Sequence, residues 1–158
     1  MYIIGINAFH GDSAACLLKD GKLVAAAEEE RFKRIKHWAG FPSQAIRWCL
    51  SEAKINLKDV SHIAINQDAK ANISKKIIYT LNKRPNFKML TDRLKNKRKR
   101  LNLKNYIINE FPRSEFNGLF HSVEHHLSHL SSAFHVSPFD EAVIVSVDGF
   151  GDFASSAW

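Results

Sequence analysis

The pair Asp20-Gly21 constrains the fold of this chain more than any other short segment. Asp-Gly between two apolar stretches is a strong signal for a two-residue hairpin, because both turn positions need a positive φ. The stretches on either side, residues 14–19 and 22–27, are therefore predicted to be antiparallel strands. Residues 2–8, which are mostly apolar, are predicted to form a buried strand before them. The chain thus begins with three strands.

A helix and a fourth strand are predicted to follow. Pro42 and Ser43 are typical of a helix start, with Ser43 as the N-cap, and apolar residues keep a 3.6-residue spacing up to Ala53. Residues 62–66 are predicted to form a short strand. The order β-β-β-α-β indicates an α/β domain with a mixed sheet.

The second part of the chain is predicted to alternate helices and strands. Residues 71–110 are expected to be helical with a break near Pro85, and residues 119–123 to form a strand. A histidine-containing helix then ends before Pro138, and the β-branched residues 142–147 predict a fully buried strand. A new hairpin is expected to begin near residue 155, so we expect the chain to be the front part of a longer protein.

Composition indicates a globular protein. The 158 residues are 45% apolar and 25% charged, enough for one domain with a real core. The first residues lack the basic region and cleavage site of a secretory signal, and no apolar run reaches the roughly 20 residues of a membrane span. Cys16 and Cys49 stand in apolar patterns typical of buried thiols. We therefore expect a cytoplasmic protein without a membrane partner.

The positive charge is concentrated in one segment. Residues 70–104 contain thirteen Lys or Arg and one acidic residue, Asp92, whereas the rest of the chain has ten basic and fifteen acidic residues. Such a segment can bind nucleic acid electrostatically. It has only Tyr79 and Phe87 as aromatic residues and no known nucleic-acid-binding signature, so a solvated helical insertion is the favoured interpretation.

His125 and His129 are candidate metal ligands. Residues four apart lie about one helical turn apart on the same face, so both imidazoles can reach one ion. On a helical wheel they lie opposite the apolar stripe of Leu127, Leu130 and Phe134, which argues against a core role. Asp148, at the end of the next predicted strand, is a candidate third ligand.

The alternative is a surface helix that carries several histidines without a metal. In the metal interpretation, His126 is rotated about 100° from His125 and is expected to tolerate substitution much better.

The turn after the first strand is a candidate anion-binding loop. Residues 5–13 are small and rich in donors, so backbone N–H groups can hold phosphate oxygens and Asp12 can orient a metal or water. Alternatively, this is an ordinary turn in which Asp12 or Ser13 satisfies backbone groups.

The charged run at residues 28–37 follows the third strand, where loops commonly carry functional groups. Arg34 or Lys36 can hold an anionic substrate there, although such runs are usually solvated.

Several blocks together resemble the O-carbamoyltransferases of the nodulation-factor and tobramycin type. The blocks are Gly-Ile-Asn at 5–7, His-Gly-Asp-Ser at 10–13, Ala-Glu-Glu-Glu-Arg-Phe at 27–32, Lys-His at 36–37, Val-Glu-His-His-Leu-Ser-His at 123–129 and Val-Asp-Gly-Phe-Gly-Asp at 147–152. They occur in the family's order and cover nearly the whole chain outside an insertion at about 68–118. Related domains occur in the hydrogenase-maturation carbamoyltransferase and the tRNA threonylcarbamoyladenosine enzyme.

The resemblance implies an actin/sugar-kinase-like (ribonuclease H-like) mixed sheet with flanking helices. The chain would hold the first half of this fold and the start of the second, with nucleotide and metal bound between the halves. The rest of the domain and a C-terminal domain that forms carbamoyl adenylate would be absent, and with them a further aspartate ligand beyond Trp158. Residues 1–158 alone are therefore expected to bind metal weakly and to be inactive.

The resemblance also implies ATP-dependent O-carbamoyl transfer. Carbamoyl phosphate and ATP give carbamoyl adenylate, which reacts with a hydroxyl of a sugar or natural product. The metal, typically iron, would be held by His125, His129 and Asp148. The expected catalytic residues are His10, Asp12 and Lys36, with His10 or Asp12 as the base and Lys36 on the anionic intermediate; the expected nucleotide-binding residues are Asn7, Gly11, Ser13 and Lys36.

Two other functions fit parts of the sequence. A sugar-kinase-like phosphotransferase fits the hairpin opening, but such kinases bind Mg²⁺ through oxygen ligands rather than imidazoles. A nucleic-acid-binding module would use residues 70–104. We expect small-molecule substrates and a homodimer rather than a nucleic-acid partner.

Overall fold

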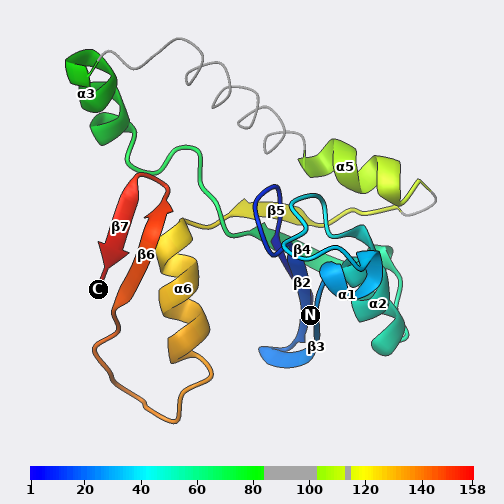
Figure 1. Cartoon of the computed structure of the whole chain (residues 1–158). Coiled ribbons are helices and arrows are strands. Elements are labelled where there is room, and N and C mark those ends of the chain that lie inside the picture. The colour runs from blue at the N-terminus through cyan, green and yellow to red at the C-terminus, as the bar shows by residue number, and fades with distance from the viewer. Residues whose placement is uncertain (84–102, 113–114) are drawn as a thin grey trace. The chain divides into compact units, whose positions relative to one another are not determined.

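The computed structural model describes residues 1–83, 103–112 and 115–158 (Figure 1). The chain forms two compact units. Unit 1 comprises Met1–Ile65 and Asp92–His121, and unit 2 comprises Asn66–Thr91 and Ser122–Trp158. In the part described, no helix is long and apolar enough to cross a membrane.

A five-stranded mixed sheet forms the centre of unit 1. Its strands are β1 (Tyr2–Asn7), β2 (Ala14–Lys19), β3 (Lys22–Glu28), β4 (Val60–Ile65) and β5 (Leu119–Ser122). Their order is β3-β2-β1-β4-β5; β1 is antiparallel to β2 and parallel to β4, and β2 is antiparallel to β3. This order is that of a ribonuclease H-like sheet, so the predicted fold class is confirmed.

The hairpin between β2 and β3 has the predicted turn. Asp20 has φ of 49° and Gly21 has φ of 80°, so both turn residues are left-handed, as a two-residue hairpin of this type requires. The predicted strands at 14–19, 22–27, 62–66 and 119–123 are confirmed to within a few residues.

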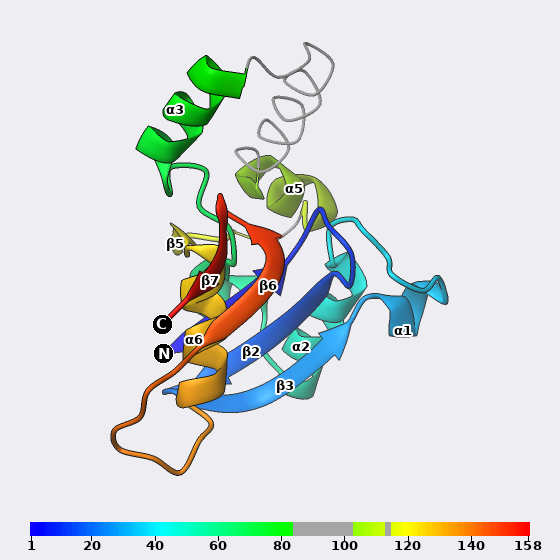
Figure 2. The same cartoon turned by 60° about the vertical axis from the view of Figure 1, so that its left-hand side comes forward.

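Helix α2 (Ser43–Glu52) packs against β2 and β3 (Figure 2), and its buried residues include Ile46, Cys49 and Leu50. The helix was predicted, but the prediction that Ser43 is its N-cap is wrong: Pro42 holds that position and makes no side-chain cap. The fully buried carboxylate of Glu29, just before α1 (Glu30–Lys33), accepts hydrogen bonds from Gln44 N at 3.2 Å and Ala45 N at 2.8 Å instead. A distant carboxylate therefore caps α2.

An apolar core fills unit 1 around β1, β2, β4 and α2. A short 3₁₀ helix (Leu57–Asp59) and α5 (Leu103–Glu110) add residues to it. The buried apolar residues are Ile4, Ile6, Ala8, Ala15, Leu17, Ala25, Phe41, Ala45, Ile46, Cys49, Leu50, Leu57, Val60, Ile63, Ile65, Leu103 and Ile107.

The basic insertion is not uniformly solvated. Helix α3 (Ile73–Lys83) is exposed even at its apolar residues Ile73, Ile77 and Leu81. The solvation prediction for residues 70–104 is wrong at Leu103, which is buried in the core of unit 1 at the start of α5; Ile107, also buried, lies beyond that segment. Residues 84–102, including the predicted break at Pro85, lie outside the described residues.

Both cysteines are free thiols in unit 1; Cys49 is fully buried, as predicted, whereas Cys16 is only half-buried. The Cys16 Sγ fills the space beside Gly5, where an added Cβ would lie 2.8 Å from the sulfur. Burial raises the pKa of both thiols, that of Cys49 to about 11. Glycine at position 5, the cross-strand partner of Cys16, therefore leaves room for the Cys16 side chain.

Unit 2 contains α3, α6 (His125–Phe134) and an antiparallel pair, β6 (Ser146–Gly151) and β7 (Ala154–Ala157). The prediction of a buried strand at 142–147 is wrong: residues 142–145 are not in a strand, and Val147 is 80% exposed. Pairing with β7 through a turn at Asp152 and Phe153 sets the bounds of β6, and β-branched composition alone cannot locate that pairing.

Candidate functional site

Helix α6 and strand β6 bring the three predicted metal ligands together. The carboxylate of Glu124 caps α6 by accepting from Leu127 N at 2.7 Å, which fixes the start of the helix directly before His125. The Nε2 atoms of His125 and His129 lie 3.1 Å apart. The Asp148 Oδ2 lies 2.6 Å from the first of these nitrogens and 3.7 Å from the second.

The charge and donor types of this cluster suit a divalent transition metal. The hydrogen bond with His125, then the hydrogen bond from Gly149 N at 2.6 Å, hold the pKa of Asp148 below its usual range, so the carboxylate is ionised near neutral pH. One potential ligand atom from each residue lies within 4.8 Å of the others. Two imidazoles and one carboxylate are a donor set that Fe(II) and Zn²⁺ accept, whereas Mg²⁺ prefers oxygen.

Two residues that were given no site role fix the position of His125. A Cβ added at Gly151 would lie 1.9 Å from the His125 ring, so only glycine allows β6 to pass this close. The Asp152 carboxylate accepts from His125 N at 3.0 Å and from Asp68 N at 2.7 Å. The amide of Asn72 donates to the Asp152 carbonyl at 2.9 Å.

The buried face of α6 differs from the helical-wheel prediction. His126 is 1% exposed and its Nδ1 lies 2.9 Å from Ser146 Oγ, whereas Leu127, from the predicted apolar stripe, is 52% exposed. A buried, hydrogen-bonded histidine packs α6 onto β6. The expectation that His126 tolerates substitution therefore loses its structural basis.

The loop between β1 and β2 is held by side chains that were predicted to bind nucleotide. The Asn7 amide donates to the carbonyl of Asp12 at 2.8 Å and more weakly to that of Gly11 at 3.5 Å. Buried Ser13 donates through Oγ to Gly40 O at 2.8 Å and accepts from Gly40 N at 3.1 Å. In this structure Ser13 thus satisfies backbone groups, which was the alternative interpretation.

A contact between Asp12 and His37 joins this loop to the segment after α1. The Asp12 Oδ1 lies 2.8 Å from His37 Nδ1, and Lys36 beside it is exposed without a hydrogen bond or ion pair to the described residues. The hydrogen bond and charge of Asp12 raise the pKa of His37, with smaller effects from Glu30 and Glu28. Sequence reasoning gave His37 no role, although it belongs to the Lys-His block.

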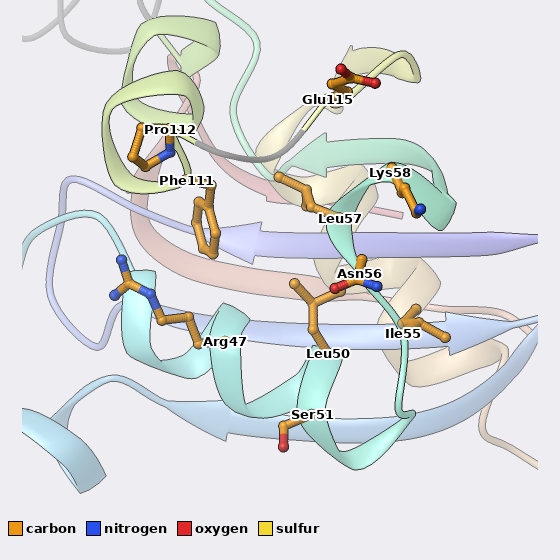
Figure 3. Close-up of a pocket in the computed structure, with 10 residues that line it drawn as sticks. All are labelled: Arg47, Leu50, Ser51, Ile55, Asn56, Leu57, Lys58, Phe111, Pro112 and Glu115. Atoms are coloured by element: carbon orange, nitrogen blue, oxygen red, sulfur yellow. The ribbon is translucent and has the colours of Figure 1, made fainter.

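A groove of about 750 Å³ lies elsewhere in unit 1 (Figure 3). Arg47 stacks over the Phe111 ring at 4.9 Å on one side, and residues that precede β4 line the other. The part of the groove lined by residues that precede β4 lies toward the amino ends of β1 and β4, because β4 begins beside Tyr2, whereas the loop with Asp12 follows the carboxyl end of β1. No predicted site residue lines this groove, so we do not assign it to the site.

Comparison with known proteins identifies the family. The family model described as Carbamoyltransferase N-terminus matches residues 2–158. The chain belongs to this carbamoyltransferase family. An uncharacterized protein of Synechocystis, sll1178, is 38% identical over 99% of the chain, which covers 26% of that protein. Nodulation protein NolNO of Sinorhizobium fredii is 36% identical over 94% of the chain, which covers 21% of that protein.

This carbamoyltransferase N-terminal chain therefore spans about a quarter of the length of those relatives. Among solved structures, YeaZ from Pseudomonas aeruginosa aligns with 48% of the chain and 34% of its own length, at 18% identity and a TM-score of 0.32. That likeness is too low to bear on the fold or the site.

Proposed function

We propose that this chain contributes to ATP-dependent O-carbamoyl transfer in the cytoplasm. The donor is carbamoyl adenylate, formed from carbamoyl phosphate and ATP, and the acceptor is a hydroxyl of a sugar or natural product. The observation that carries the proposal is the convergence of His125, His129 and Asp148 in a chain of the carbamoyltransferase family. Imidazole donors do not suit the Mg²⁺ chemistry of a sugar kinase.

In this proposal His125, His129 and Asp148 hold a divalent metal, for which we propose iron. When bound, such an ion polarises a carbonyl or phosphoryl oxygen and stabilises negative charge. The chain prepares the donor set: Gly151 and Asp152 position His125, and the hydrogen bond with His125 keeps Asp148 ionised. The cluster needs little rearrangement to act as a chelating group.

The loop residues would serve the carbamoyl donor and the acceptor. Lys36 is an exposed cation that suits the phosphate of the adenylate, and the exposed backbone at Gly11 leaves room for a close approach. Asn7 and Ser13 hold the loop in shape through their backbone contacts. His10 and Asp12 would lie near the carbamoyl group and the acceptor.

The test uses the complete gene product, because the chain spans only about a quarter of its relatives. Purified protein is incubated with carbamoyl phosphate, ATP and a panel of sugar and natural-product hydroxyls, and carbamoylated product and bound metal are measured. We expect His125→Ala and His129→Ala each to lose metal and transfer together. The control is His135→Ala at the exposed end of the same helix, which should retain both.

Full metal occupancy in the double His125/His129 variant would overturn the metal site. Absence of carbamoylated product from the wild-type protein with every acceptor would overturn the proposed activity. Residues 1–158 alone should bind metal more weakly than the complete gene product and give no transfer.

A further inference from the structure

Asp12 and His37 have the arrangement of an acid–base dyad. The carboxylate oxygen lies 2.8 Å from Nδ1 of the imidazole, which fixes the tautomer with the proton on Nδ1 when the ring is neutral. The other ring nitrogen, Nε2, has no hydrogen-bond partner among the described residues, and the His37 side chain is 78% exposed. A neutral imidazole held in this way presents a free lone pair to a ligand.

The backbone on both sides of the pair is fixed. Asp12 has φ of 61° and His37 has φ of 54°, a left-handed conformation that is uncommon outside glycine and concentrates at functional sites. The Asn7 amide holds the carbonyl of Asp12, and Glu30 Oε2 accepts from His37 N at 3.2 Å.

Further hydrogen bonds join the two loops that carry the pair. Ser13 N donates to Trp38 O at 3.0 Å, and Phe9 N donates to Gly40 O at 3.1 Å. The Ser13 hydroxyl also bonds to both backbone groups of Gly40. The exposed pair therefore sits on a rigid support, so its geometry does not depend on two free surface side chains meeting by chance.

The charges that face His37 favour its protonated form. Asp12 comes from the β1–β2 loop, Glu30 from α1 and Glu28 from the end of β3. All three are acidic and raise the pKa of His37 above that of a free imidazole. A base is most useful when its pKa lies near the working pH, and these acidic neighbours raise the pKa of His37 in the direction of neutral pH.

We propose that His37 accepts the proton of the acceptor hydroxyl, with Asp12 as the residue that orients it. The inference rests on the proposed function. The hydroxyl O–H bond breaks and its proton goes to His37 Nε2, while the hydroxyl oxygen forms a bond to the carbamoyl carbon. The bond from that carbon to the adenylate phosphate oxygen breaks, and AMP leaves as the anion. His37 then returns its proton to solvent.

This assignment refines the expectation that His10 or Asp12 is the base. The Nε2 of His10 is shielded from solvent, whereas His37 is open to it. Asp12 already uses a carboxylate oxygen on His37, so that oxygen is engaged in orienting the imidazole. The pair divides the work between one orienting group and one proton acceptor, as in the dyads of hydrolases.

The decisive variant is His37→Asn in the complete gene product. Asn can donate to Asp12 from the position of Nδ1 and tolerates a left-handed backbone, but it cannot accept a proton. We expect kcat for carbamoyl transfer to fall about 100-fold or more, with the fold unchanged. In His37→Ala, kcat should decrease by a similar factor, and added imidazole should restore part of the activity. The matched control is His135→Asn, which should keep wild-type kcat.

Two pH measurements separate proton transfer from a structural clamp. The acidic limb of the kcat profile should disappear in His37→Asn and move to lower pH in Asp12→Asn. Independently of activity, NMR titration of the His37 ring should give a midpoint above about 6.5 that falls in Asp12→Asn.

Wild-type transfer together with near-wild-type kcat in His37→Asn would overturn this inference alone, because it would show that the contact is only structural. No transfer by the wild-type protein would overturn the proposed function and this inference with it. An unchanged His37 midpoint in Asp12→Asn would also contradict the dyad.

Discussion

Each of the two units is stabilised internally by a different kind of interaction. Every residue of the apolar core lies in unit 1. Among the described residues of unit 2, the buried ones are Gln67, His126, Ser146 and Gly151, none of which is a large apolar residue. Unit 2 is ordered instead by hydrogen bonds around Asp152 and by the contact between His126 and Ser146.

Because of this difference, the residues that stabilise the fold are distinct from the candidate site residues in unit 1 but lie next to them in unit 2. In unit 1, burial of aliphatic side chains fixes the sheet, and the candidate dyad is added at its surface through two loops. In unit 2, the same polar contacts that order the backbone also position His125. A change that spares the metal donors but disturbs their neighbours should therefore affect binding in unit 2, whereas in unit 1 it should affect stability.

The strongest test of the comparison is Ile63→Ala set against Val147→Ala. Ile63 is fully buried in β4, so its truncation should lower the free energy of unfolding by roughly 2–5 kcal/mol through lost burial and a cavity. Val147 in β6 is 80% exposed, and its truncation should change stability by less than about 0.5 kcal/mol. Urea denaturation followed by circular dichroism measures both. Equal losses would show that unit 2 depends on apolar burial as much as unit 1.

The next test concerns Gly151. Alanine there would place a Cβ 1.9 Å from the His125 ring, so the ring must move and divalent-metal affinity should fall about 10–100-fold. Gly149→Ala is the matched control, because an added Cβ at that glycine meets no atom within 4 Å. Competition with a fluorescent chelator reports both affinities. A similar loss in the two variants would mean that backbone stiffening, rather than the contact with His125, lowers the affinity.

The smallest effect is expected at Glu29, the polar exception in unit 1. Glu29→Gln keeps one acceptor for the first turn of α2 but loses the charged cap, which should lower the free energy of unfolding by about 1 kcal/mol. Hydrogen exchange should accelerate at Gln44 and Ala45 and remain unchanged in β4. Glu52→Gln, exposed at the other end of α2, should have no measurable effect; an equal loss there would contradict capping by Glu29.

Local sequence patterns predicted most of the fold. The Asp20-Gly21 turn and the proximity of His125 and His129 depend on residues close together in sequence, for which backbone geometry allows few conformations. The helix α2 was predicted for the same reason, but its cap was not, because Glu29 is distant in sequence.

The errors share one cause. The wheel for α6 assumed that apolar residues face inward, whereas His126 is buried and Leu127 is exposed. The pairing of β6 with β7 and the contact of Asp12 with His37 likewise depend on which distant segment lies opposite. Contacts of this kind are determined by tertiary packing between distant segments, so they cannot be predicted from a short stretch of sequence.

The cysteine thiols offer a way to measure local opening of unit 1. A thiol reagent attacks the thiolate, and burial keeps both Cys16 and Cys49 protonated near neutral pH. Cys49 is fully buried between α2 and the sheet and can react only when α2 moves away from β2 and β3, whereas Cys16 on β2 is only half-buried. No other cysteine exists to add a second signal. The rate at which Cys49 is labelled therefore reports the local opening of unit 1, and unit 2, which has no cysteine, contributes nothing to this signal.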